Sequence, residues 1–429
     1  MRFFRLEIKR ILSSLRTKII FSIILLLSVL MAYSPIRKEE VSYQDSHGKL
    51  VELTGREALQ YKKKIQRPSN KELTSAKLKK ALTIFQDFQR KYPETRKGEN
   101  ITKNVAELQQ KKISPIVPLL SIIEMFINIP KQPNSDFGDY SYDGLTLMKP
   151  QDMDSFYTFY SQQLRQQISQ RYKSAPKIQK KAMKMNAKIK KPFQLYAGYT
   201  NAAFDSFSEF IFLLVVLCLI IAVPTFSHEY ETGTDAILRC TKKGRSFFVF
   251  TKISALFFLF FLVSVFSLGL HLLILNVLFG FDCCKTSIQL VSSFSVNPTV
   301  LLNSTVGGTQ IILAIGGMLT LFATISLTLF FSARFKNSLT VLVISLAACF
   351  FPTLGRTLFD GQVNWLICLF PSAGVGSGNS LYRQLMDLNF LRLGSTGFFS
   401  PYVILLAAVL AIPIFLFLTV RSYNKHQAN

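Results

Sequence analysis

The sequence predicts an all-α polytopic membrane protein with six transmembrane helices and a mostly helical extracellular domain between the first and the second of them. Three observations lead to this prediction. The chain of 429 residues is 49% hydrophobic, contains 39 Phe and has only 17% charged residues, which excludes a soluble enzyme built around one core. Its apolar residues gather in runs close to the roughly 20 residues that a helix needs to cross a bilayer. A single long polar block, residues 34–205, separates the first run from the others.

The first 18 residues interleave basic and large apolar side chains. This pattern predicts an amphipathic helix over 1–18 that lies flat on the inner leaflet and continues into a first span at 19–33. A cleavable signal peptide is the alternative, because Ala32 and Ser34 form a small-residue cleavage pattern. The long basic region and Pro35 favour a retained anchor.

The polar block carries helix signals rather than strand signals. Thr54 and Glu57 form a capping-box pattern that predicts a helix through Ile65, and Asn70 is predicted to cap a longer helix. Periodic apolar residues predict further helices, joined by a connection that contains Pro and Gly. These helices are expected at 101–112, 153–172 and 175–190.

Charge is concentrated in the same block. It holds 31 of the 50 Lys and Arg residues and 17 acids, so its net charge is +14. Anionic lipid, cell-wall polymer or an acidic ligand are the partners that such a domain beside a bilayer would meet, and a merely solvated basic surface is equally open. No nucleic-acid-binding motif accompanies the charge, so nucleic acid is not an expected partner. The six Cys residues lie outside the block and form neither a disulfide framework nor a metal-binding spacing.

The remaining apolar runs predict five more spans and fix the topology. Basic residues in the short segments number 15 on the side of the N-terminus and 4 on the other side, which predicts a multi-pass membrane protein with both termini in the cytoplasm. Residues 363–370 are too short to cross and predict either a re-entrant hairpin or a surface loop. The spans are expected at 206–226, 248–277, 309–332, 338–354 and 401–420, with extracellular loops at 278–308 and 355–400, a cytoplasmic turn at 333–337 and a cytoplasmic tail at 421–429.

The polar segment between the second and third spans, 227–247, is the candidate functional site. It combines acids, a Gly-Thr pair, a short apolar patch and a basic cluster, which is the composition of a short interfacial helix offered to a soluble partner. The residues expected at that interface are Glu229, Glu231, Gly233, Thr234, Leu238, Arg239, Lys242, Lys243, Gly244 and Arg245.

This segment resembles the coupling segment of ABC-2 type transporter permeases. A Glu-x-x-x-Gly-Thr pattern, a short apolar helix, a Lys-Gly-Arg run and a Lys that opens the next span carry the resemblance. Many members have a Pro shortly before the basic residue, whereas this chain has Thr241 to Gly244, which looks like the Gram-positive branch with a large extracellular domain. The matching residues are Glu229, Gly233, Thr234, Leu238, Arg245 and Lys252.

The resemblance implies the membrane subunit of an ATP-driven exporter, with a second permease half, identical or different, and cytoplasmic ABC ATPase subunits as partners. The chain has no G-x-x-x-x-G-K-[ST] loop, so ATP and Mg would bind the ATPase, and no catalytic, cofactor or metal-binding residues are expected in this chain. The HExxH zinc pattern that begins at His228 is incomplete, because Thr232 stands where the second His is needed.

Two other functions stay open from the sequence. A non-transporting receptor would use the outer domain to bind a ligand. A secondary carrier is disfavoured because ionisable residues are scarce within the spans, and the polar residues His271 and Asn276 are expected to form interhelical hydrogen bonds. Peptide antimicrobials, lipids and cell-wall precursors are all open as substrates of an exporter.

Overall fold

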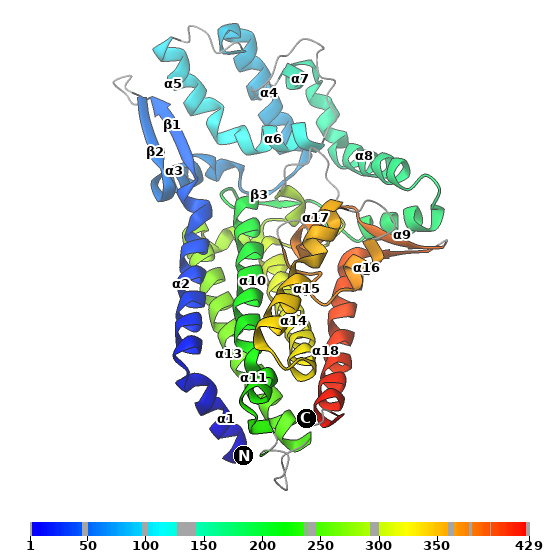
Figure 1. The fold of residues 1–429 in the computed structure, drawn as a ribbon. Helices are drawn as coiled ribbons and strands as arrows, with labels where there is room; N and C mark the ends of the chain where they lie inside the picture. Colours follow the sequence, from blue (N-terminus) through cyan, green and yellow to red (C-terminus); the bar gives the residue numbers. More distant parts are fainter. Residues whose placement is uncertain are drawn as a thin grey trace.

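The computed structural model describes residues 2–44, 50–96, 102–126, 143–235, 237, 246–291, 300–358, 364–376, 380–394 and 396–425. Long helices stand side by side in a bundle, and a layer of shorter helices covers one end of it (Figure 1). Both chain termini lie at the other end, which we call the base. An even number of crossings predicts this placement of the termini on one side.

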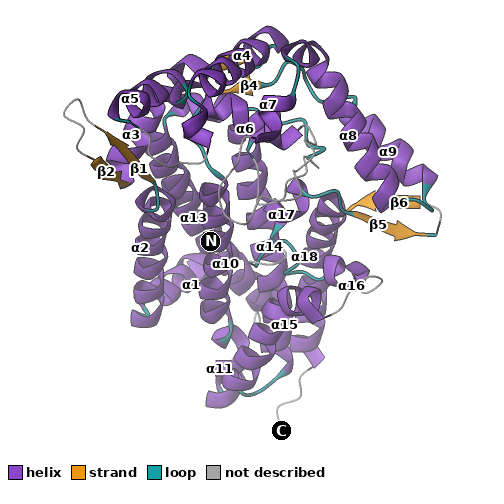
Figure 2. Ribbon diagram, turned by 90° about the horizontal axis from the view of Figure 1, so that it is seen from above, coloured by secondary structure: helices purple, strands orange, loops and turns teal. Residues whose placement is uncertain are grey.

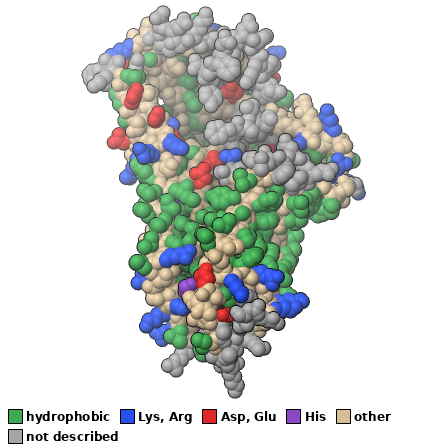
Figure 3. Space-filling model, viewed as in Figure 1, with side chains coloured by type: hydrophobic (Ala, Val, Ile, Leu, Met, Phe, Trp, Pro, Cys, Tyr) green, Lys and Arg blue, Asp and Glu red, His purple; other side chains and the backbone are tan. Residues whose placement is uncertain are grey.

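Among the residues that the structure describes, six helices are long and apolar enough to cross a membrane, which supports a multi-pass membrane protein. Each contains the residues predicted for one span. On the face shown in Figure 3, a band of hydrophobic side chains covers the bundle, with Lys and Arg above and below it. These helices are α2 (Leu15–Arg37), α10 (Asn201–Ala222) with its continuation α11 (Pro224–Thr232), α13 (Ser246–Phe279), α14 (Val306–Arg334), α15 (Ser338–Leu358) and α18 (Ser400–Lys425).

The N-terminal helix is shorter than predicted. Helix α1 spans Arg2–Ser13, and Ser14 adopts an extended conformation, so residues 15–18 belong to the membrane helix α2. Its apolar side packs in part on protein, because the ring of Phe3 lies 6.3 Å from Phe247 and that of Phe4 lies 5.9 Å from Phe258, both on α13.

The layer at the far end is formed mostly by the polar block, and most of its predicted helices are present. Two short antiparallel sheets, which the sequence analysis did not predict, also occur in it. The helices are α3 (Gly55–Gln66), α4 (Ser75–Lys91), α5 (Lys103–Lys112), α6 (Val117–Phe126), α7 (Asp143–Leu147), α8 (Phe156–Arg171) and α9 (Pro176–Asn186), and the strand pairs are β1 (Glu40–Gln44) with β2 (Leu50–Thr54) and β3 (Lys71–Glu72) with β4 (Gln194–Leu195).

Two predicted helix caps in this block are wrong in detail. Helix α3 begins after Thr54 as expected, but the Thr54 side chain makes no capping hydrogen bond. Thr74, not Asn70, caps α4 by accepting a hydrogen bond from the backbone N–H of Lys77 at 3.3 Å. The Asn70 side chain instead accepts from the N–H of Ala197 at 2.9 Å, which ties the start of the segment before α4 to the last residues of the polar block.

The polar block contributes to two cores rather than one. Helices α4 to α6 and the start of α8 enclose a core around Phe85, Phe156 and Phe193. The second half of α8 and helix α9 instead add Leu164 and Ile178 to the core that runs through the membrane bundle. Part of the block is therefore continuous with the bundle.

Short elements connect α15 to α18, the last two long helices of the bundle. They are α16 (Asn364–Leu369), α17 (Leu381–Met386) and an antiparallel hairpin of β5 (Phe390–Leu393) and β6 (Thr396–Phe399). Helix α16 lies against α15 and α18 and has six residues, too few to cross a bilayer.

Candidate functional site

Gly233 forms a left-handed turn at the start of the candidate segment. Gly233 ends α11 with φ 69° and ψ 5°, a left-handed conformation that glycine adopts without steric cost. A β-carbon placed on Gly233 would meet nothing within 4 Å. The requirement for glycine is therefore set by the backbone and not by a neighbouring side chain.

Glu229 is buried, although the sequence analysis expects it at an exposed interface. The residue is 5% exposed, and its carboxylate forms an ion pair with the ammonium group of Lys252, which is 1% exposed. Lys252 Nζ also donates to the carbonyl of Thr225 at 2.9 Å and lies over the rings of Phe226 and Phe248, at 5.5 and 4.8 Å. Because Glu229 is on α11 and Lys252 on α13, the pair fastens together the two helices that flank the candidate segment.

The N-terminal helix joins this pair. Arg10 Nη1 lies 3.8 Å from Glu229 Oε1, and Arg10 Nε lies 2.9 Å from Glu7. The Arg10 side chain is half exposed, so its guanidinium group contacts solvent as well as the buried pair. We call Glu7, Arg10, Glu229 and Lys252 the base cluster.

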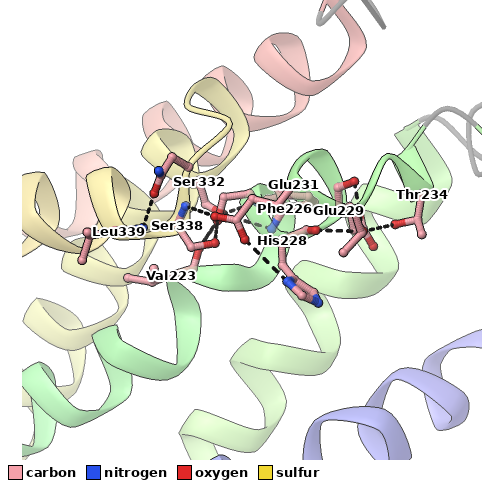
Figure 4. A network of polar contacts seen from close by, with 12 residues as sticks. Val223, Phe226, His228, Glu229, Glu231, Thr234, Ser332, Ser338 and Leu339 are labelled. Atoms are coloured by element: carbon pink, nitrogen blue, oxygen red, sulfur yellow. Dashed lines mark hydrogen bonds and ion pairs between the residues drawn. The ribbon is translucent and has the colours of Figure 1, made fainter.

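Glu231 connects α11 to a different helix. Its Oε1 accepts a hydrogen bond of 2.6 Å from the backbone N–H of Ser338, the first residue of α15 (Figure 4). A carboxylate at this position satisfies a free N–H and opposes the positive end of the helix dipole. His228 lies beside it, with Nδ1 3.6 Å from Glu231 Oε2.

The backbone of α11 is held from α14 as well. Ser332 Oγ accepts from the N–H groups of Phe226 and Ser227 at 3.0 and 3.1 Å and donates to the carbonyl of Val223 at 2.7 Å (Figure 4). These bonds lie where Pro224 follows Val223 and the chain passes from α10 into α11. A single hydroxyl thus satisfies the backbone groups that this break in the helix leaves open.

The structure places four of the ten predicted interface residues. Thr234 follows Gly233, and its hydroxyl lies 3.0 Å from that of Thr232. Ile237 is 72% exposed at the base. The other six predicted residues lie outside the described part of the chain; they are Leu238, Arg239, Lys242, Lys243, Gly244 and Arg245.

Comparisons with family models, with curated proteins and with solved structures find no match to this chain. The resemblance to ABC-2 permeases therefore stays a prediction from the sequence of the segment. Among the described residues, no group of His, Cys, Asp and Glu could hold a metal ion.

Interhelical hydrogen bonding is confirmed for one of the two polar residues predicted in the third span. Asn276 exchanges two hydrogen bonds with Gln310 on α14, at 3.0 and 2.9 Å, and Gln310 also donates to Tyr199 at 3.0 Å. His271 is buried and stacks on Phe210, with ring centroids 4.9 Å apart.

Sequence reasoning missed Glu209, an acid inside the second span. Its neighbour Ser206 donates a hydrogen bond to the carbonyl of Met31 on α2, and Glu209 lies almost one helical turn deeper. The side chain is exposed on the surface of α10. Glu209 lies within the predicted span 206–226 and is an exception to the scarcity of ionisable residues expected in the spans.

Proposed function

We propose that this chain is the membrane-spanning permease subunit of an ABC-2 type exporter, which couples ATP hydrolysis on a separate cytoplasmic ATPase to export across the bacterial plasma membrane. The observation that carries the proposal is the ion pair between Glu229 and Lys252. It joins the two helices that enter and leave the segment resembling a coupling segment, at the end of the bundle where both termini lie. Both residues also belong to the matched pattern.

The base cluster gives a physical route from the ATPase to the spans. Closure of the ATPase would displace the segment 227–247. Because Glu229, Lys252 and Arg10 tie α11, α13 and α1 together, and Glu231 ties α11 to α15, the displacement would move these helices as one body. Rigid helices would then transmit the movement to the opposite end of the bundle.

Glu209 supports the need for a second permease half. A carboxylate at membrane depth is costly beside lipid and is normally found facing protein or a water-filled cavity. A second half, identical or different, that packs near α10 would enclose this residue. Glu209 also favours a second candidate function, a secondary carrier, which would move substrate on an ion gradient without ATP.

The proposal requires the base to be cytoplasmic and the helical layer to be extracellular. The test is labelling of intact cells with an impermeant thiol reagent, in a chain whose own Cys residues are replaced by Ser. A Cys at Lys97 should react and a Cys at Lys243 should not. The reverse pattern would overturn the orientation and place the candidate segment out of reach of a cytoplasmic ATPase.

Co-purification tests the coupling role itself. Reversing the charge of the basic cluster should abolish both recovery of an ATPase with the permease and transport-stimulated ATP hydrolysis, while the protein still inserts. An equal number of exposed basic residues on α4 and α5 provides the control, which should leave both readouts at the parental level. The two variants are Arg239→Glu, Lys242→Glu, Lys243→Glu and Arg245→Glu, and Lys80→Glu, Arg90→Glu, Lys111→Glu and Lys112→Glu. Unchanged recovery and hydrolysis in the first variant would favour the receptor function instead.

A further inference from the structure

Helix α9, the hairpin β5–β6 and helix α16 form a unit that we call the overhang. In two views at right angles, α9 and the hairpin extend sideways beyond α18 (Figures 1 and 2). The hairpin leads directly into α18, since Phe399 is its last residue and Ser400 begins the helix. The overhang is therefore at the level where the last membrane helix leaves the bilayer.

Specific contacts hold α9 to the hairpin. The side chain of Ile178 lies against Gly397, where a β-carbon would collide with it. Lys181 Nζ donates to the carbonyl of Gly397 at 3.0 Å. In the turn between α8 and α9, the Tyr172 hydroxyl donates to the carbonyl of Leu388 at 2.7 Å and accepts from the N–H of Phe390 at 2.9 Å. These contacts make α9 and the hairpin one body.

The lipid-facing stripe of α18 continues onto the overhang. Exposed apolar residues recur every three or four positions along the helix, and Phe398 on β6, two residues before the helix begins, is 42% exposed. At the end of β5, Leu393 is 62% exposed, and on α16 Leu366 and Leu369 are 66% and 50% exposed. The stripe on α18 consists of Tyr402, Leu406, Leu410, Ile414 and Phe417.

Positive charge begins where this apolar stripe ends. The ammonium group of Lys181 lies 5.2 Å from the centre of the Phe398 ring. Residues 173–191 contain eight Lys and no acid. Apolar side chains next to a row of lysines are typical of a surface that sits in a membrane interface, with the lysine stems over lipid and their charges among the phosphates. All eight are exposed: Lys173, Lys177, Lys180, Lys181, Lys184, Lys188, Lys190 and Lys191.

We propose that the overhang binds anionic phospholipid headgroups of the leaflet at the end of the bundle opposite the base. Leu393 and Phe398 enter the interface of that leaflet, and the lysines of α9 bind the phosphates. The occupant is the bilayer that already surrounds α18, because the apolar surface of the overhang is continuous with the lipid-facing stripe of that helix. This inference does not depend on the transport function proposed above.

The chain has a single Trp, and it reports on this surface. Trp365 on α16 packs on Phe398, with ring centroids 6.1 Å apart. The full chain, purified in a neutral detergent, is titrated with phosphatidylglycerol or with phosphatidylcholine carrying brominated acyl chains, which quench Trp fluorescence on contact. We expect half-maximal quenching at a concentration of phosphatidylglycerol about tenfold or more below that of phosphatidylcholine, since each lysine near an anionic surface contributes roughly fivefold in affinity.

Replacing three exposed lysines of α9 and of the turn that follows it, by Lys180→Gln, Lys184→Gln and Lys188→Gln, should lower that preference by at least about tenfold. The control removes the same charge from α4 and α5, by Lys80→Gln, Lys111→Gln and Lys112→Gln, and should keep the preference. Equal quenching by the two lipids, or an unchanged preference in the α9 variant, would overturn the proposal. Displacement of brominated phosphatidylglycerol by inorganic phosphate or glycerol phosphate at equal phosphate concentration would also overturn it, because the ligand would then be free phosphate and not lipid.

Discussion

Two ion pairs join separate elements of the chain, one at each end of the bundle, and they differ in burial. At the base, the side chains of Lys252 and Glu229 are 1% and 7% exposed. At the opposite end, Arg171 on α8 pairs with Asp387, ahead of the hairpin, and these side chains are 44% and 39% exposed. Water can hydrate the separated charges of the second pair but not those of the first. Removing one charge of the Glu229–Lys252 pair should therefore cost much stability. Removing one charge of the outer pair, which adds specificity, should cost little.

The outer pair nonetheless has good geometry. Arg171 donates from Nη1 and Nη2 to the two carboxylate oxygens of Asp387, at 2.7 and 3.2 Å, and Nη2 donates to Asn389 at 2.7 Å. Burial acts to lower the pKa of Arg171, but the hydrogen bond and the charge of Asp387 outweigh it, and the pKa is raised. The arginine thus stays charged at every pH of interest, and salt should weaken the contact because exposed charges are screened.

The largest effect on stability is expected from removing one charge of the Glu229–Lys252 ion pair at the base. Glu229→Gln leaves the Lys252 ammonium buried without a counter-charge, so it should lower the free energy of unfolding by about 3–5 kcal/mol. Thermal unfolding of the purified protein, followed by its helical circular dichroism, measures the loss. Adding Lys252→Met removes the unpaired charge and should recover most of the lost stability, and this recovery distinguishes a buried pair from general damage.

An exposed pair provides the control for that experiment. Arg90 and Asp87 are 3.7 Å apart on α4, with side chains 81% and 64% exposed. Replacing Asp87 by Asn should change the stability by at most about 1 kcal/mol. Similar losses of stability for Glu229→Gln and Asp87→Asn would show that burial does not make the ion pair at the base costlier to break than an exposed pair.

An intermediate effect is expected at Gly233. A β-branched residue is strained at positive φ, so Gly233→Val should cost about 1–3 kcal/mol and redirect the chain that follows α11. Gly233→Asn should cost much less, because Asn tolerates this conformation and no atom lies within 4 Å of the new β-carbon. The measurement is transport-stimulated ATP hydrolysis, expected to be lost in the Val variant and largely kept in the Asn variant. Equal activities would mean that the turn does not direct the coupling segment.

The smallest effect is expected at the outer pair. Asp387→Asn should cost at most about 1 kcal/mol, and the cost should shrink as salt is raised, because exposed charges are screened. Unfolding of the parental protein and of the variant at low and high salt measures this. A loss as large as that of Glu229→Gln, independent of salt, would remove the contrast between the two ends.

The six long helices could be predicted from the sequence because runs of apolar residues are a local signal. The sheet of β3 and β4 could not, since Lys71 and Leu195 pair across more than a hundred positions. The same limit applies at the site. The positive φ of Gly233 follows from residue type, whereas the burial of Glu229 follows from Lys252 on another helix, and a charge beside a span is otherwise expected to face water. Likewise, Asn70 was predicted to cap a helix because its true partner, Ala197, is remote in sequence.

Photocrosslinking at Ile237 tests most directly whether the base is a coupling site. This residue is 72% exposed and lies between Gly233 and the basic cluster. A benzophenone amino acid at Ile237 is predicted to form an adduct in cells with a polypeptide that carries the G-x-x-x-x-G-K-[ST] loop, identified by mass spectrometry. The same probe at Leu147, 65% exposed in the helical layer, should form no such adduct. An ATPase adduct at Leu147, or adducts at Ile237 with lipid alone, would contradict the account.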